Sequence, residues 1–217
     1  MIFDWSYAAS ILPVLARAAV VTIEATFLSF SLALILGLLL ALMRMSGVKP
    51  IASASLWFVE VIRGTPLLVQ LFILFLILPK YGLTMPAFVT GVVGLGIHYS
   101  AYCAEVYRAG IESVPRGQWE ASRALNMGTF HTYRDIILPQ AFPPIIPALG
   151  NYLISLFKET PLLSAVAVVE LLQAALLLGS DSFRYIEPIT LVGVFFLVMS
   201  LFAAAAVRLV ERRLQAR

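Results

Sequence analysis

The chain has 217 residues, of which 61% are hydrophobic and only 12% are charged. This composition excludes an ordinary soluble domain, because apolar segments too long for core helices recur along the sequence. The formal net charge of +3 does not indicate a nucleic-acid partner, since the basic residues are spread between and after the apolar segments.

Five apolar segments reach or nearly reach the roughly 20 residues needed to cross the hydrocarbon core of a bilayer. They predict five transmembrane helices, at residues 18–43, 51–79, 86–107, 136–157 and 189–207. The stretch 162–178 is ambiguous, because it fits either a sixth span or the second half of a broken fourth one. No basic region or small-residue cleavage site opens the chain, so we expect no cleaved signal peptide.

The positions of the basic residues predict the orientation of these helices. With five crossings, one side of the membrane receives Arg44, Lys49, Arg108, Arg116, Arg123, Arg134, Arg208, Arg212, Arg213 and Arg217. The opposite side receives Arg17, Lys80 and Arg184. Because basic residues are enriched in cytoplasmic segments, the N-terminus is expected outside and the C-terminus in the cytoplasm. A sixth span would remove this bias, so we expect one all-α integral membrane domain, residues 1–217, with five transmembrane helices.

The second predicted span is interrupted at Gly64-Thr65-Pro66, immediately after Arg63. A broken helix at membrane depth is tolerated only where protein or a water-filled cavity receives the freed backbone groups. We therefore expect Arg63, Thr65 and Gln70 to line a path through the membrane. The structural alternative is that Arg63 pairs with Glu60, which lies three residues earlier on the same helix.

The third predicted span carries polar residues at two depths. His98 lies nearer the membrane centre and is a further candidate for the path, although a lone histidine there is more often a packing residue. Towards the cytoplasmic end, charged residues repeat at spacings of three and four, namely Glu105, Arg108, Glu112 and Arg116. This spacing predicts a ladder on one helix face, either solvated or in interhelical salt bridges.

A long polar segment, residues 108–135, separates the third and fourth predicted spans. Its pattern predicts a helix over 118–125, a turn at Asn126-Met127-Gly128 and a second short helix over 130–137 with Thr129 as its N-cap. A short turn would connect the two spans equally well. The segment, about residues 115–139 with the start of the next span, is therefore predicted to be a docking surface for a partner.

The fourth predicted span contains Pro143, Pro144 and Pro147 and ends at Lys158-Glu159-Thr160-Pro161. Because each interior proline removes a backbone hydrogen bond, we expect a second broken span. An ionised side chain at bilayer depth costs about 2.5–3.5 kcal/mol and normally faces a partner or a cavity. Lys158, Glu159 and Thr160 offer an ammonium, a carboxylate and a hydroxyl, which together suit a zwitterionic solute. The alternative is that Lys158 only pairs with a carboxylate of another chain.

Two further acidic residues lie in apolar surroundings. Glu24, in the first predicted span, is expected to be buried and to pair with a subunit partner. Glu170 shares a helix face with Gln173, and both are expected to line an outer vestibule.

The sequence lacks the motifs of common catalytic and nucleotide-binding sites. It contains no GxxxxGK[ST] phosphate loop, no HExxH and no serine nucleophile elbow. The single cysteine, Cys103, excludes a cysteine-built metal site or an internal disulfide. We therefore expect neither catalysis by this chain alone nor a resident cofactor or metal.

The polar segment resembles the EAA loop of ATP-binding-cassette importer permeases. That loop reads E-A-A, three residues, G, nine residues, then I-x-L-P. The matching residues are Glu120, Ala121, Ile136, Leu138 and Pro139, with Ser122 in place of the second alanine and Asn126 in place of the glycine. Asparagine is the next-best residue for a left-handed turn, and Gly128 lies in the same turn. The resemblance implies that Glu120 engages a groove on an ATPase while Ala121 and Ser122 allow close seating.

Other segments are similar to the polar amino-acid branch of the same permeases, namely residues 63–70, 113–118, 138–141 and 158–162. Within that branch, residues 1–5 and 168–173 are most similar to permeases for ectoine and hydroxyectoine. The resemblance implies two permease subunits, identical or paralogous, two cytoplasmic ATPase subunits and an extracellular or periplasmic solute-binding protein, in a bacterial cytoplasmic membrane. The rival hypothesis is an ion-driven transporter or channel whose intramembrane charges form a relay.

Overall fold

The computed structural model describes residues 3–215, with side chains up to residue 213. Met1, Ile2 and Arg217, which enter the sequence predictions above, lie outside this range. All regular structure within residues 3–215 is helical, which confirms the all-α class. Three helices are long and apolar enough to cross a membrane, and the number rises to five if each of two bent helix pairs counts as one span.

The first long helix, α1 (Trp5–Met45), starts well before the predicted span at residue 18 because Asp4 caps it. The Asp4 carboxylate accepts hydrogen bonds from the backbone N–H groups of Ser6 and Tyr7. Farther along, α1 packs closely on α4 (Ala87–Glu112) through small residues. A Cβ added at Gly37 would lie 2.6 Å from the Cys103 Cβ atom, so glycine is what allows this approach.

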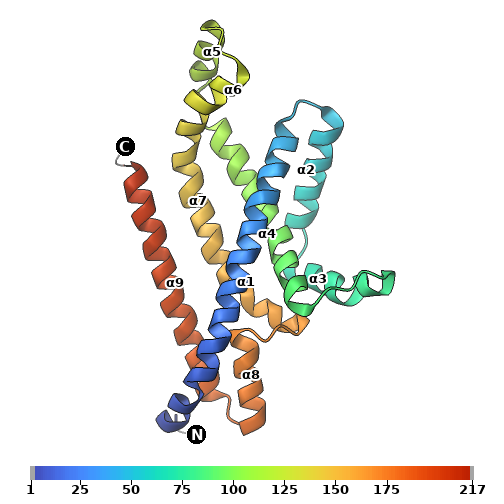
Figure 1. Ribbon diagram of the computed structural model, residues 1–217, viewed down its shortest axis with the longest axis vertical. Helices are drawn as coiled ribbons and strands as arrows, with labels where there is room; N and C mark the ends of the chain where they lie inside the picture. Colours follow the sequence, from blue (N-terminus) through green and yellow to red (C-terminus); the bar gives the residue numbers. More distant parts are fainter. Residues whose placement is uncertain (1–2, 216–217) are drawn as a thin grey trace.

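The second predicted span is sharply bent. Helix α2 (Lys49–Arg63) stops at the predicted break, and the chain continues as α3 (Leu67–Phe72), a π-helical segment (Ile73–Ile77) and a 3-10 turn (Leu78–Tyr81). The segment after the break turns by 103° and projects sideways from the other helices (Figure 1). The predicted break is thus confirmed, and the second predicted span is bent there by 103°.

The fourth predicted span is interrupted at the predicted Lys158-Glu159-Thr160-Pro161 break and not at Pro143, Pro144 and Pro147. Helix α7 (Leu138–Glu159) runs through all three of them and continues a shorter helical stretch made of α6 (Thr129–His131) and a π-helical segment (Thr132–Ile137). The interruption follows at a 3-10 segment (Thr160–Val166) and at Ala167, whose φ is 62°. Helix α8 (Leu171–Ser182) then departs by 48°. At 12 residues, or about 18 Å, α8 is too short to be a sixth span.

The last helix, α9 (Ile186–Gln215), packs on α7 and, near its start, on α1 and α8. The main core joins α1, α3, α4 and α7 around Leu71, Leu95, Leu156 and Leu163, all of which are fully buried. Helix α5 (Arg116–Ala124) and α6 project beyond the other helices at one end of the molecule (Figure 1). The α1–α2 turn and the end of α9 lie on the same half, whereas the N-terminus and α8 lie at the opposite end.

Candidate coupling loop and polar cluster

The projecting loop has the turn that its sequence predicts, with two corrections. Asn126 is left-handed, with a φ of 55°, and the N–H of Met127 donates to the carbonyl of Ser122 at 3.0 Å. Gly128 is not left-handed; its φ of −64° and ψ of 152° make it the extended residue before α6. Thr129 is therefore the first residue of α6 and not its N-cap.

Aromatic and aliphatic packing fixes this loop to the helices that carry it. The rings of Trp119 and Tyr133 meet edge to face, with centroids 5.4 Å apart. Ser122 is 1% exposed, and its hydroxyl donates to the carbonyl of Trp119. Below them, Val114 and Ile137 belong to one buried cluster. Because α5 is held in this way, it can move as one unit with α4 and α7.

The residues of the EAA resemblance divide into an inner and an outer set. Ser122 is buried and Ile136 and Leu138 are half-buried, whereas Glu120, Ala121 and Pro139 are exposed. Two large apolar side chains that sequence reasoning missed join the outer set: Leu125 is 73% exposed and Phe130 is 69% exposed. The sequence could have indicated them, because both are large apolar residues inside an otherwise polar segment. An exposed carboxylate flanked by exposed apolar side chains is the composition of a protein-docking face.

At the bend after α2, three predicted path residues are joined by hydrogen bonds. The Gln70 amide nitrogen donates to the carbonyl of Ile62 and to the Thr65 hydroxyl, each at 2.8 Å. Its amide oxygen lies 3.1 Å from Nδ1 of His98 on α4. Gln70 therefore satisfies a carbonyl freed by the break and fixes the bend to α4.

An aromatic group extends this cluster towards α7. Tyr99, Tyr102 and Tyr152 have ring centroids 5.4–6.3 Å apart, and the Arg63 guanidinium lies 5.5 Å from the Tyr102 centroid. Glu159 lies against Tyr99, and its Oε2 atom is buried without a hydrogen-bond partner. A buried acceptor of this kind favours any donor that can reach it.

The structure thus brings together Arg63, Thr65, Gln70, His98 and Glu159, but it does not add the other two predicted path residues. Lys158 is exposed on the surface of the chain, in no ion pair among the described residues. Thr160 is fully buried, and its hydroxyl donates to the carbonyl of Phe157 at 2.8 Å. The alternative pairing of Arg63 with Glu60 is not seen, because no ion pair joins them in the described part of the chain. The Arg63 guanidinium stacks on the Tyr102 ring.

Two other predicted charged groups, the ladder on α4 and Glu170, have structural roles. Glu105 accepts from Arg108 and from Arg44 of α1, each at 2.7 Å, and Arg108 also pairs with Glu112, which confirms the predicted ladder as an interhelical salt bridge for these residues. Arg116 is not part of it, because α4 ends at Glu112 and Arg116 begins α5. The predicted vestibule role of Glu170 is wrong, because its carboxylate is fully buried and caps α8 by accepting from the N–H groups of Leu172 and Gln173. Glu24 is exposed on α1 and not buried within this chain.

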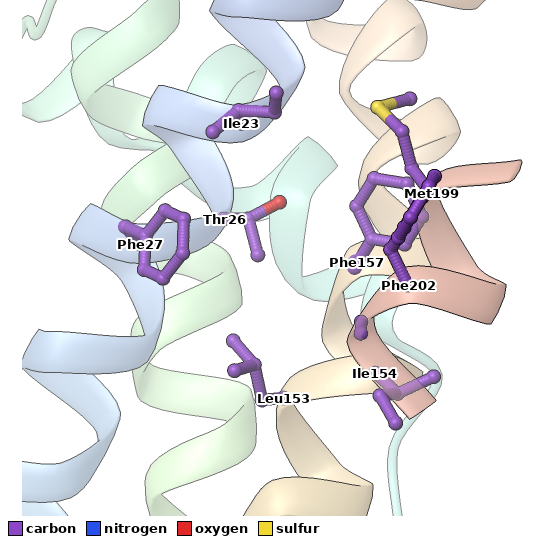
Figure 2. A pocket seen from close by; sticks show the side chains of 9 residues that line it. Ile23, Thr26, Phe27, Leu153, Ile154, Phe157, Met199 and Phe202 are labelled. Atoms are coloured by element: carbon purple, nitrogen blue, oxygen red, sulfur yellow. The ribbon is translucent and has the colours of Figure 1, made fainter. Parts of the chain in front are cut away.

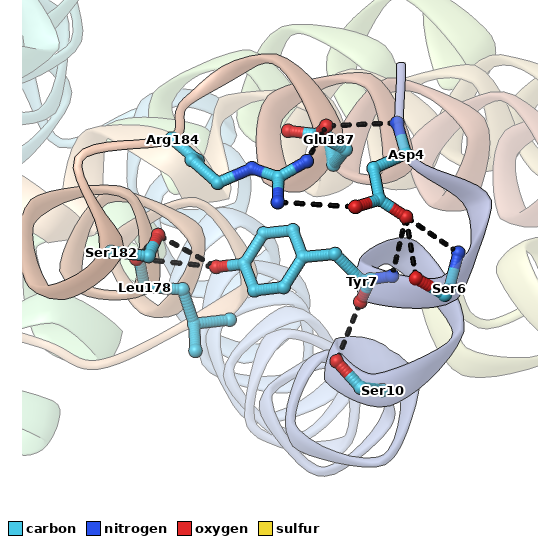
Figure 3. Close-up of polar contacts among 8 residues, drawn as sticks. All are labelled: Asp4, Ser6, Tyr7, Ser10, Leu178, Ser182, Arg184 and Glu187. Carbon is cyan, nitrogen blue, oxygen red and sulfur yellow. Dashed lines mark hydrogen bonds and ion pairs between the residues drawn. The ribbon is translucent and has the colours of Figure 1, made fainter. Parts of the chain in front are cut away.

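A second polar cluster, at the N-terminal end, was not predicted (Figure 3). Arg184 lies 3.2 Å from the Asp4 carboxylate and 2.7 Å from that of Glu187, and its guanidinium stacks 4.6 Å from the Tyr7 ring centroid. Glu187 also accepts from the N–H of Asp4. Hydrogen bonds from the Ser6 hydroxyl and the Tyr7 N–H, together with Arg184, lower the Asp4 pKa to about 2. These contacts join sequence positions about 180 residues apart, which no local pattern could indicate.

A pocket of about 260 Å³ opens between α1, α7 and α9 (Figure 2). Ile23, Phe27, Phe157 and Met199 are among its lining residues, and Thr26 contributes a single hydroxyl, which donates to the Thr22 carbonyl. With so little polar lining, this pocket does not suit a zwitterionic solute, so the polar cluster around Gln70 and Glu159 is the better candidate.

Long apolar helices joined by a projecting helix-turn-helix define a multi-pass membrane protein. The family model described as "Binding-protein-dependent transport system inner membrane component" matches residues 33–216, and the chain belongs to this family. Its members are membrane transport components, so this chain is a transport component and not an enzyme.

Individual relatives agree with this assignment. The chain is 45% identical to a "Probable amino-acid ABC transporter permease protein" of Sinorhizobium fredii, over 99% of this chain and 93% of the relative. It is 41% identical to the "L-cystine transport system permease protein TcyB" of Bacillus subtilis, over 93% and 87% of the two chains. A solved structure described as "Crystal structure of an amino acid ABC transporter with histidines" matches with a TM-score of 0.93 and 39% identity, over 98% of this chain and all of the other.

Proposed function

We propose that this chain is the permease subunit of an ATP-driven importer for a zwitterionic polar amino acid or a similar compatible solute. The observation that carries the proposal is the projecting loop, which presents Glu120 and Ala121 on a rigid support at the spacing of the EAA motif. Two ATPase subunits would receive such loops, a second permease, identical or paralogous, would complete the channel, and an extracellular or periplasmic binding protein would deliver the solute.

The proposed orientation has the N-terminus outside, the C-terminus in the cytoplasm and five crossings of a bacterial inner membrane. Helix α5, the α1–α2 turn and the end of α9 share one half of the molecule. These segments carry the basic residues Arg44, Lys49, Arg116, Arg123, Arg208, Arg212 and Arg213. The excess of lysine and arginine on cytoplasmic segments supports placing this half inside. The loop then faces the ATPases.

The polar cluster gives the proposed solute path its chemistry. The unpartnered Glu159 oxygen suits a solute ammonium group, and the Arg63 guanidinium suits a carboxylate. Gln70, Thr65 and His98 supply neutral donors and acceptors beside them, while Lys158 and Thr160 follow in the same sequence motif. Ectoine and hydroxyectoine are zwitterions that fit this requirement, and the resemblance at residues 168–173 adds them to the candidate solutes. An ion-driven mechanism is not favoured, because it would leave the docking loop without a role.

Reconstitution of the full complex in proteoliposomes tests both parts of the proposal. With labelled amino acids and ectoine supplied through the binding protein, ATP-dependent uptake is expected for at least one of them. Glu120→Arg should lower uptake about tenfold or more, because it places a cation where the ATPase groove receives an anion. Asp135→Arg is the matched control, since it reverses another exposed carboxylate of the same segment outside the motif match. Normal uptake by the Glu120→Arg complex would reject the docking role.

A further inference from the structure

Two pockets follow one another between α7 and α9, and we term the pair the α7–α9 groove. The first is the pocket of about 260 Å³ in Figure 2, which α1 also lines. The second, of about 190 Å³, is lined by Ile146, Pro147, Gly150, Ala206, Val207 and Val210. A Cβ added at Gly150 would lie 2.8 Å from the Cγ2 atom of Val207, so the two helices touch at this point. The groove is therefore a surface feature of a packed helix pair.

The length of the groove matches the thickness of one leaflet of a bilayer. Along α9 it extends from Met199 to Val210, and along the antiparallel α7 from Ile146 to Phe157. At 1.5 Å per residue, each of these stretches is about 17 Å long. Half of the hydrocarbon core of a bilayer is about 15 Å thick. Since most of the α9 stretch belongs to the apolar segment 189–207, the groove runs from about the centre of the membrane towards one of its surfaces.

The lining and the width of the groove suit a lipid chain. Its side chains are aliphatic, aromatic or thioether groups, apart from the Thr26 hydroxyl, which donates to the Thr22 carbonyl. Phe27 and Phe202 are exposed, so the first pocket is open to the surroundings of the chain. A helix about 10 Å wide would occupy roughly 1,300 Å³ over a length of 17 Å, several times the volume of either pocket. A thin, flexible acyl chain can enter the groove, whereas a helix of another protein cannot.

A basic cluster follows the groove at the end of α9. Residues 208–213 carry three exposed arginines and one glutamate, Glu211, and therefore a net charge of +2. None of these arginines pairs with an acidic group within residues 3–213. Arg213 lies on the helix face that lines the groove, because it continues the spacing of four and three residues set by positions 199, 203, 206 and 210. Arg208, two residues from both Ala206 and Val210, lies on the opposite face.

We propose that the α7–α9 groove binds an anionic phospholipid of the cytoplasmic leaflet, with one acyl chain against α7 and α9 and the phosphate at Arg213. An arginine guanidinium can bind two phosphate oxygens at once, which suits this position. The inference rests on the proposed function for its orientation, in which the end of α9 lies in the cytoplasm. The bound chain packs beside Phe157, two residues from Glu159 of the polar cluster, and stabilises the contact between α7 and α9.

Photo-cross-linking of the complete complex tests this site. The complex is reconstituted in phosphatidylcholine vesicles that contain a small share of phosphatidylglycerol with a diazirine in the middle of one acyl chain. A phosphatidylcholine probe with the same chain serves as the comparison, and mass spectrometry locates the labelled peptides. We expect labelling of residues 146–157 and 199–210, about fivefold stronger with phosphatidylglycerol, because an arginine near the membrane surface attracts an anionic head group.

Two pairs of variants separate the head-group site from the chain site. Arg213→Gln should remove the preference for phosphatidylglycerol, whereas Arg208→Gln, on the opposite face, should keep most of it. Ala206→Phe places a ring in the groove and should lower labelling by both probes. Ala205→Phe adds the same ring at an exposed neighbour outside the pocket lining and should leave labelling unchanged. The yield of assembled complex, measured for each variant before labelling, excludes misfolding as the cause of a weaker signal.

Three results would overturn the proposal. The groove is covered by protein if neither probe labels it while other exposed helices are labelled. Equal labelling by both probes rejects the phosphate site, as does an equal loss of preference in Arg208→Gln and Arg213→Gln. ATP-dependent uptake by the same vesicles separates this inference from the proposed function. Uptake without a preference for phosphatidylglycerol rejects the lipid site alone, and a clear preference without uptake of any supplied solute rejects the transport assignment alone.

Discussion

Asp4 combines two stabilising roles at the start of the longest helix. Its carboxylate caps α1 and also pairs with Arg184, so it fixes the first turn of α1 to the turn between α8 and α9. Asp4→Ala removes both contacts and should lower the midpoint of thermal unfolding in detergent by a few degrees. Asp4→Asn keeps a capping oxygen but loses the charge, so it should fall between the wild type and Asp4→Ala. Equal midpoints for all three proteins would contradict this account.

The same residue makes a prediction about acid stability. The pKa of Asp4 in the folded protein is about 2, below its ordinary value of 3.8. A lowered pKa means that the contribution of Asp4 is fully present above pH 3.8 and is lost as the pH falls towards 2. The difference in unfolding midpoint between wild type and Asp4→Asn should therefore shrink across this range, which midpoints measured at several pH values would show.

At the scale of whole elements, the contact between α1 and α4 depends on small residues. A Cβ at position 37 would lie 2.9 Å from the backbone carbonyl oxygen of Ser100, which has no freedom to move aside. Gly37→Ala should therefore destabilise the protein by about 1–3 kcal/mol. Gly193→Ala, in α9, is the matched control, because nothing lies within 4 Å of its added Cβ. The control should be neutral or stabilising by roughly 0.5–1 kcal/mol, since alanine favours a helix over glycine. Chemical denaturation of the wild type and both variants in the same detergent would measure these changes in the free energy of unfolding.

Local sequence patterns predicted several features of the helices correctly. They failed for features that depend on packing between distant segments. The break at Gly64 to Pro66 and the left-handed Asn126 follow from residue types and were predicted correctly. The 103° angle of the bend was not predicted, because it depends on how Leu67 and Leu71 pack into a core built from distant helices. The second interruption, at Lys158 to Pro161, was also predicted, whereas Pro143, Pro144 and Pro147 do not interrupt α7, because neighbours such as Ile145 are held in a buried cluster.

The two candidate sites also differ in how far the sequence predicts them. The residues of the candidate coupling loop are contiguous, so their spacing alone was enough to propose them. The polar cluster could be predicted only in part from the sequence, because Gln70, His98 and Glu159 come from three separate segments. Their residue types pointed to a polar path, but the three tyrosines that connect them carried no signal distinct from ordinary packing. Lys158 is exposed on the surface of the chain, and sequence alone cannot tell which side of a helix faces the cluster.

At the scale of the whole molecule, α7 connects the two candidate sites. Helical structure is continuous from Thr129 in the projecting loop to Val166, so Glu159 lies towards one end of a helical rod and the loop at the other. A movement of the loop can therefore reach the polar cluster as a rigid-body displacement. The burial of Leu156 and Phe157 against neighbouring helices would carry that displacement into α3 and α9.

Breaking this rod should separate ATP hydrolysis from uptake. Ser155 is exposed on α7 between the loop and Glu159, so its side chain belongs neither to the core nor to either site. Ser155→Pro removes one helical hydrogen bond and kinks the helix at a cost of about 3 kcal/mol. We expect the complex to assemble and hydrolyse ATP, but uptake should fall about tenfold and the stimulation of hydrolysis by the loaded binding protein should disappear. Ser155→Ala, which keeps the helix, should transport as the wild type does. If Ser155→Pro co-purifies with its ATPase and still shows normal, stimulated uptake, α7 does not act as the connecting rod.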